Sequence, residues 1–185
     1  MISLEDFIYK QTKTAIRKIT PQELSDIYVY SFFVSDIDDD PRHPSLTIGY
    51  NTRTNLKETI KDATSAEEAK WDYAFWLQNE LAVIGKDVTS QELIEEWIEN
   101  KNLYYTDGDE DDDYETCVDK GEKITTAFNT SLIHAVQQLH VKHVTNLPIV
   151  IHELDYDDDI KKQNIRANGI KRVGEFTTWI EGGGK

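Results

Sequence analysis

Apolar residues recur at spacings of three and four along several parts of this chain, a pattern typical of amphipathic helices. One such stripe spans residues 3–19, and the most regular one runs over residues 123–143. Shorter stripes begin at Ser90 and, near the end of the chain, around Phe176. We therefore expect a long central helix, a helix at each end of the chain, and one further helix between them.

Runs of β-branched and aromatic residues indicate strands at 27–34, 45–52 and 147–154. A turn-rich acidic loop joins the first two runs, which predicts an antiparallel hairpin covered on one side. Segment 71–80 is the densest in aromatic residues, and its spacing fits a strand and a helix equally well. These elements predict an α+β fold, in which a mainly antiparallel sheet packs against the long core helix at 123–143 and the terminal helices flank it.

The chain has the length of one domain, and neither a long linker nor an internal repeat divides it. We expect a single α+β domain over residues 1–185. Residues 106–116 contain a run of acidic side chains that cannot bury apolar surface, so they are expected to form a loop or a mobile insertion. The glycine-rich tail at 182–185 is expected to fray.

The net charge of -15 is concentrated in the middle third of the chain. Residues 61–120 hold 18 acidic and 5 basic side chains, whereas the thirds on either side are close to neutral. A field of this kind repels nucleic acid and anionic membranes, and it attracts a basic protein partner. A simpler interpretation also stays open, namely that the charge only keeps the protein in solution.

The chain lacks the features of an exported or membrane-spanning protein. Cys117 is its only cysteine, which excludes an internal disulfide and fits a reducing compartment. No signal peptide is visible, and no apolar run reaches the length of a membrane span. No glycine-rich phosphate loop or dinucleotide fingerprint occurs, so no cofactor is expected. These observations predict a cytoplasmic protein.

The acidic run is the first candidate site. Its first three alternating aspartates match a calcium-binding loop, but Asp112 stands where that loop requires glycine and Val118 where it requires glutamate. No metal site is therefore predicted. The simplest interpretation of the run is a solvated acidic loop, and as a candidate site it is proposed to contact a partner. The residues proposed for this contact are Asp107, Asp109, Asp111, Asp112 and Asp113.

The histidines are weaker candidates. His140 and His143 are three residues apart, whereas zinc proteases require a spacing of four with a glutamate beside the first histidine. We expect this pair to act as cations at a helix C-terminus, and His152 to be a structural histidine at a strand edge. Cys117 lies among acidic residues, which raise the pKa of a thiol and disfavour a nucleophilic role.

The aromatic segment is the last candidate. Trp71 and Trp76, with polar residues at 78–80 beside them, could form a surface that contacts a partner or ligand. The competing interpretation, which we favour, is that these rings fill the core. One of them can also do both if its ring is exposed.

Three segments together resemble the bacterial DUF4303 family, whose domain has no assigned function. They are the opening helix leading into 28–32, the aromatic segment at 71–76, and a C-terminal stretch. That stretch is the most specific and comprises residues 149–156, 163–165, 167–169, 176 and 179–180. The acidic run around 107–115 matches no part of the pattern. The resemblance implies a single-domain α+β cytoplasmic protein, of a kind often considered as a toxin antidote, and it carries over no catalytic residues.

Two functions from different classes follow from these observations. The first is an interaction protein, such as an immunity-type antidote whose acidic middle third covers a basic toxin surface. The alternative is a metal-assisted enzyme that uses the aspartate clusters with His140, His143 or His152, and it requires these groups to converge. The first is the prediction taken forward, and enzymatic activity is left open.

Overall fold

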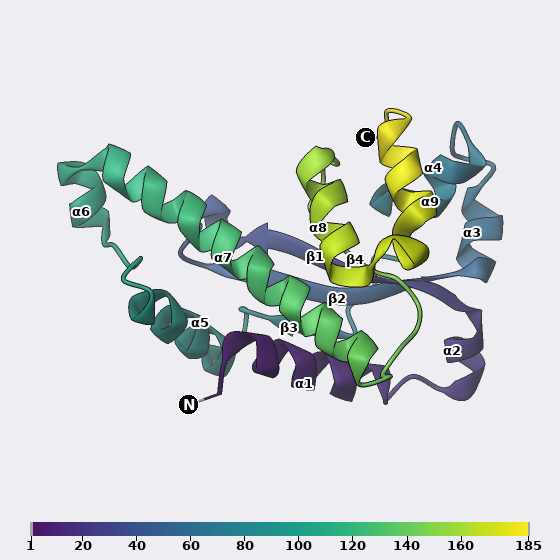
Figure 1. The fold of residues 1–185 in the computed structure, drawn as a ribbon, viewed down its shortest axis with the longest axis horizontal. Coiled ribbons are helices and arrows are strands. Elements are labelled where there is room, and N and C mark those ends of the chain that lie inside the picture. Colours follow the sequence, from purple (N-terminus) through teal and green to yellow (C-terminus); the bar gives the residue numbers. More distant parts are fainter. Residues whose placement is uncertain (1, 185) are drawn as a thin grey trace.

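A computed structural model describes residues 2–184 as a four-stranded sheet with helices packed on both faces (Figure 1). The strand order in the sheet is β3-β2-β1-β4. In chain order the elements are α1 (Leu4–Ile16), α2 (Pro21–Asp26), β1 (Ile27–Asp36), the 3₁₀ turn η1 (Ile37–Asp39), β2 (Pro44–Thr52), α3 (Arg53–Thr59), α4 (Ala66–Trp71), the 3₁₀ turn η2 (Tyr73–Phe75), β3 (Ala82–Ile84), α5 (Val88–Asn100), α6 (Asp107–Asp112), α7 (Tyr114–Val141), β4 (Ile149–His152), α8 (Asp158–Asn168) and α9 (Ile170–Glu181).

The α+β fold is confirmed, and the sheet is mixed. β1 pairs antiparallel with β2, and β2 pairs antiparallel with β3, whereas β1 pairs parallel with β4. The expectation that helices cover one face only is wrong, because alternate residues of β1 are buried in two different cores. Phe32 belongs to a core with α1, α5 and α7, and Val29 belongs to a second core with α4 and α9. In an antiparallel sheet with one solvent-exposed face, every second residue of a strand is polar. In β1 the residues on both faces are mostly apolar and buried.

The long core helix was predicted at 123–143 and is observed as α7, which begins nine residues earlier. Its first turns carry small residues on the buried side, Cys117 and Gly121, which do not register as an apolar stripe. A Cβ at Gly121 would lie 2.9 Å from Pro41 Cγ, so close packing against the β1–β2 connection requires glycine there. The hydrophobic pattern therefore underestimated the length of this helix.

The expectation of an acidic loop or insertion at 106–116 is wrong, because this segment forms α6 and the start of α7. Thr106 and Asp109 form a capping box that satisfies two backbone N–H groups at the start of α6. Asp113 then caps α7 by accepting a hydrogen bond from the Thr116 N–H. The helix dipole stabilises carboxylates in the first turn. An acidic composition therefore does not by itself indicate a loop.

Asparagine side chains take the place of neighbouring strands at both edges of the sheet. On α8, Asn164 bonds the N–H and C=O of Ile151, at 2.9 and 2.7 Å, and Asn168 bonds those of Ile149, both at 2.9 Å. On the opposite side, Asn79 bonds the N–H and C=O of Tyr50, each at 3.0 Å. Unpaired strand edges are a liability for aggregation, and these amides saturate the edge groups without adding a strand.

Segment 71–80 and the tail depart from simple elements. The aromatic segment includes the last residue of α4 and the turn η2, and then becomes irregular, so neither a strand nor a long helix forms there. The tail, expected to fray at 182–185, carries backbone hydrogen bonds from Gly183 to Ile180 and from Gly184 to Trp179. Residue 185 lies outside the described part of the chain.

Candidate functional site

Carboxylates gather at one end of the molecule, which we call the acidic end: residues 87–122, from α5 to the first turns of α7, and residues 36–40 of the β1–β2 connection. α5, α6 and the start of α7 lie together at this end, away from α3, α4 and α9 (Figure 1). Residues 87–122 contain fourteen Asp and Glu but only two Lys, a net charge of −12 out of −15 for the whole chain. The negative charge that is concentrated in one segment of the sequence is therefore also concentrated at one end of the folded molecule.

The capping carboxylates of the acidic end are held in their charged form. Hydrogen bonds from Thr106 lower the pKa of Asp109, and hydrogen bonds from Thr116 lower the pKa of Asp113. All five aspartates predicted to bind a partner, at 107, 109 and 111–113, are exposed. Their carboxylates face solvent, so they are accessible to a charged partner.

Arg42 ties α6 to the sheet. Its guanidinium contacts Asp40 at 2.6 Å and Asp107 at 2.8 Å, and it lies 4.9 Å from the centre of the Tyr105 ring. The hydrogen bond to Asp40, followed by that to Asp107, raises the pKa of Arg42. Asp107, predicted to contact a partner, is thus partly engaged inside the molecule.

Asp36 shows how crowded the carboxylates are. Burial, and then the nearby charges of Glu153, Asp40 and Asp39, raise its pKa to about 6. Asp38 and Asp39 both adopt the left-handed backbone conformation with φ of 57°, which few residue types other than glycine tolerate as well as aspartate. Like charges are therefore held together at this turn at a cost in folding free energy.

Exposed apolar side chains lie among these charges. Tyr114 and Val118, one turn apart on α7, are 65% and 42% exposed, and Tyr104 in the preceding connection is 39% exposed. Interfaces commonly combine an aromatic or aliphatic centre with a polar rim. The acidic end has both components on α7 and the segment before it.

The histidines do not converge on one site. His140 is buried, with Nδ1 at 3.1 Å from the Thr145 carbonyl oxygen and Nε2 at 3.0 Å from Asn168 Oδ1. It lies in the last turn of α7, as expected, whereas His143 follows the helix and is exposed. Within residues 2–184 no three His, Cys, Asp or Glu side chains are arranged to hold a metal ion.

His152 belongs to the second core. Its Nδ1 lies 3.0 Å from the Glu153 carbonyl oxygen and its Nε2 lies 2.8 Å from Ser31 Oγ, so the neutral ring donates to the first and accepts from the second. Burial lowers its pKa to about 4. A serine–histidine pair at this distance resembles an activated nucleophile, but Ser31 is 3% and His152 0% exposed. This histidine is structural, as the sequence predicted.

Cys117 is buried near the start of α7. Burial, together with neighbouring carboxylates, raises the pKa of its thiol, as the sequence analysis expected. The thiolate is thereby disfavoured, and Cys117 acts as a small packing residue beside Gly121.

Trp71 and Trp76 are buried at 4% and 5% exposure, so neither ring offers the exposed partner contact proposed from the sequence. Trp76 donates from Nε1 to the Lys70 carbonyl oxygen at 3.0 Å, while its ring packs against Tyr73. The favoured interpretation, that these rings fill the core, holds for Trp76. Trp71 has a second role because it also lines a groove.

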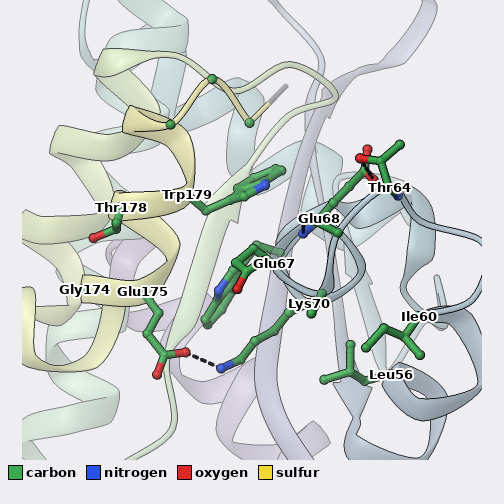
Figure 2. Close-up of a pocket in the computed structure, with 16 residues that line it drawn as sticks. Leu56, Ile60, Thr64, Glu67, Glu68, Lys70, Gly174, Glu175, Thr178 and Trp179 are labelled. Carbon is green, nitrogen blue, oxygen red and sulfur yellow. Dashed lines mark hydrogen bonds and ion pairs between the residues drawn. The ribbon is translucent and has the colours of Figure 1, made fainter.

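A groove of about 880 Å³ separates α3 and α4 from α9 (Figure 2). Trp71 and the half-buried Trp179 line it together with Leu56 and Ile60. Figure 2 shows Lys70 reaching across the groove to Glu175, with which it forms an ion pair.

This groove was missed at the sequence level. The usable signal was on the last predicted helix, where Gly174, Glu175 and Trp179 fall on its less buried side while Phe176 and Ile180 face the core. Trp179 is half-buried on this side of α9, where it is available to line a groove.

Within residues 2–184, no helix combines the length and apolar character that a membrane span requires. Comparisons with protein-family models, with curated proteins and with solved structures find no match to this chain. The resemblance to the DUF4303 family therefore stays a prediction, and the functional argument rests on the geometry of the acidic end and the groove.

Proposed function

We propose that this chain is an interaction protein of the cytoplasm, whose acidic end binds a basic surface of a partner protein. The role that fits best is that of an immunity-type antidote, which neutralises a toxin by covering its basic surface. The observation that carries the proposal is the net charge of −12 over residues 87–122 on one end of the molecule.

The charges of the acidic end support binding because they are not neutralised internally. Two lysines face fourteen carboxylates in residues 87–122, and the added cation Arg42 already contacts Asp40 and Asp107. A partner that brings lysines and arginines would relieve the repulsion between these carboxylates. Complementary fields of this kind mainly raise the rate of association, and salt weakens them.

The apolar centre gives such a complex a means to persist. Tyr114 and Val118 are exposed on α7 between carboxylates, and tyrosine is enriched where interfaces bury an anchor. The same field disfavours nucleic acid and anionic membranes as partners, because both carry negative charge.

The proposal is tested by capture from a lysate of the native host on immobilised protein, at about 0.05 M and about 0.5 M salt. We expect a protein with a basic surface to be retained at low salt and released at high salt. The captured protein should also be toxic when expressed alone and harmless when expressed with this chain.

A variant carrying Asp111→Asn, Asp112→Asn and Glu115→Gln provides the specificity control, since none of these residues caps a helix. The variant should lose the captured protein. Retention of the same partner by the variant, or recovery of no basic protein at either salt concentration, would contradict the proposal.

The metal-assisted alternative has no comparable support. It required the aspartate clusters and His140, His143 or His152 to converge, and these histidines contact different parts of the fold. We do not propose it as a second function.

A further inference from the structure

The helices α4 and α9, which line the groove described above (the α4–α9 groove), lie at the opposite end of the molecule from α5 and α6, so the groove is separate from the proposed partner contact (Figure 1). Its volume of about 880 Å³ falls in the range of small-molecule sites, roughly 300–1,000 Å³. The walls are helices packed on the second core, through Trp71 on one side and Phe176 on the other. The groove is therefore a fixed feature of the fold rather than a gap between loops.

The charge of the groove favours a cation. Three carboxylates line it, from Glu67, Glu68 and Glu175, against the single ammonium of Lys70. Lys70 is already paired with Glu175, which leaves the two α4 carboxylates without a basic partner among the described lining residues. The C-terminal end of α9 also borders the groove, and its partial negative charge acts in the same direction.

The start of α4 disfavours an anion. Ser65 Oγ accepts from the Glu68 N–H at 3.0 Å, and Glu68 in turn accepts from the N–H and hydroxyl of Thr64. These bonds lower the pKa of Glu68, so its carboxylate is charged at neutral pH. This carboxylate would repel a phosphate that approached the start of α4.

The indole rings add an apolar, cation-binding surface. Lys70 Nζ lies 5.0 Å from the centre of the Trp71 ring, so the groove already holds one ammonium over an aromatic face. Trp179 faces the groove from α9, and its ring is fixed by edge-to-face contact with Tyr156 at 5.1 Å. Trp179 and Glu67 line the same groove from α9 and α4, so an indole ring and a carboxylate are available there to a second cation.

Glycines border the Trp179 side of the groove. A Cβ at Gly174 would meet no atom within 4 Å, so the space beside α9 is empty at that point. A Cβ at Gly184, in contrast, would collide with the Trp179 ring, so the tail backbone lies against part of the indole. The room for a slender ligand is therefore beside Gly174.

From these observations we infer that the α4–α9 groove binds a small, flexible organic cation, an alkyl ammonium or guanidinium compound, between Trp179 and the α4 carboxylates. The aliphatic part lies along the indole rings and Ile60, and the charged group pairs with Glu67. The face of an indole ring attracts such a cation through the ring quadrupole.

The test is titration of the purified chain with agmatine, a free guanidinium–ammonium compound, followed by tryptophan fluorescence and by calorimetry. We expect saturable binding at a one-to-one ratio that weakens about tenfold in Trp179→Ala and about threefold to tenfold in Glu67→Gln. The matched control is Glu99→Gln on α5, which removes the same charge at the acidic end and should bind agmatine like the unaltered chain.

Gly174→Leu separates loss of the site from loss of the fold. Leucine at this position should fill the groove and abolish agmatine binding, while replacement of a glycine inside the helix should raise the melting temperature of the protein. Glu67 and Gly174 lie away from the acidic end, so both variants should still capture a basic partner. The proposal for the groove can therefore be contradicted without affecting the proposal for the acidic end, and the reverse.

Several outcomes would overturn the inference. Equal weakening by Glu67→Gln and Glu99→Gln would mean non-specific attraction to an acidic protein. Binding of inorganic phosphate in preference to agmatine would mean that the groove selects anions instead of cations. Binding of an arginine-containing peptide without binding of free agmatine would mean that the groove recognises a polypeptide instead of a small cation.

Discussion

Around strand β4 the buried polar side chains are paired one by one, whereas at the acidic end carboxylates lie beside other carboxylates. Asn164 and Asn168 match both polar groups of two strand residues, and His152 finds a partner for each ring nitrogen. Asp36, in contrast, is held near three carboxylates that oppose its ionisation. Pairing of the first kind stabilises the fold, and crowding of the second kind costs folding free energy.

The difference separates structural polar groups from those available for binding. A protein optimised only for stability would pair or disperse the charges of the acidic end, as it pairs the polar groups beside β4. Retaining them unpaired is reasonable if a partner supplies the missing cations. Four substitutions or pH changes test the two sides of this comparison.

The largest expected effect is the pH dependence of stability that comes from His152. Its pKa is about 4 in the folded protein and about 6.5 when unfolded, so the unfolded chain binds more protons between these values. Its contribution is fully present above pH 6.5 and is lost as pH falls towards 4, by about 3 kcal/mol. Urea unfolding across this range, compared with His152→Phe, isolates the slope; an equal slope in both proteins would contradict the assignment.

The second effect concerns the asparagines that cover the edge of β4. Asn164→Ala would leave the buried N–H of Ile151 without a partner and its C=O with only the longer bond from Gln163, at a cost of about 2 kcal/mol. Chemical denaturation measures the change. The exposed Asn146 provides the control, since Asn146→Ala should alter stability by less than about 0.5 kcal/mol. Similar values for both variants would show that the edge bonds add little.

The third effect concerns Arg42, the cation that joins α6 to the sheet. Arg42→Gln removes its ion pairs with Asp40 and Asp107 and its contact with Tyr105, and should destabilise the fold by about 1–2 kcal/mol. Amide hydrogen exchange should rise in α6 and in the first turns of α7 before it rises elsewhere. Unchanged exchange in α6 would mean that its cap, rather than Arg42, holds it in place.

The smallest effect has the opposite sign. The folded-state pKa of Asp36, about 6, is above its unfolded value, so the folded protein binds the proton more tightly and loses stability as pH rises from about 4 to 6. Asp36→Asn should therefore stabilise the protein at pH 7 by about 1 kcal/mol, after allowance for solvent screening, and should have little effect below pH 4. Destabilisation at pH 7 would indicate an unrecognised favourable contact.

The sequence predicted the elements whose buried faces are apolar and failed where the buried face is small or polar. β1 and β2 are rich in β-branched and aromatic residues, so their positions were confirmed within a few residues. α8 went unpredicted because two of its buried residues, Asn164 and Asn168, are polar and bond the edge of β4. The sequence of a helix does not show that its polar residues will bond the edge of a strand, so a helix with a polar buried face is not recognised.

The candidate sites were predictable to different degrees. Most of the acidic end, residues 87–122, is contiguous in sequence, so its charge was visible directly. The helix beginning at Ser90 was also predicted, whereas the helical conformation of residues 107–116 depends on the caps Thr106 and Asp113 and was not. The groove joins α4 to α9 across more than a hundred residues, and the pair Lys70–Glu175 follows only from the packing of those helices. Local pattern carries no information on which two helices become neighbours.

The central claim is that the acidic end recruits a basic partner, and association kinetics test it most directly. With the captured partner immobilised, the variant Asp111→Asn, Asp112→Asn, Glu115→Gln is compared with a control that removes three exposed carboxylates elsewhere. The control substitutions are Glu58→Gln, Asp62→Asn and Glu80→Gln.

The account predicts that the association rate of the acidic-end variant falls about tenfold or more at low salt, and that the control retains the rate of the unaltered chain. The difference between the acidic-end variant and the unaltered chain should shrink at about 0.5 M salt, where screening is strong. Equal losses in the two variants, or no loss in either, would show that overall charge rather than the acidic end governs binding, and would contradict the claim.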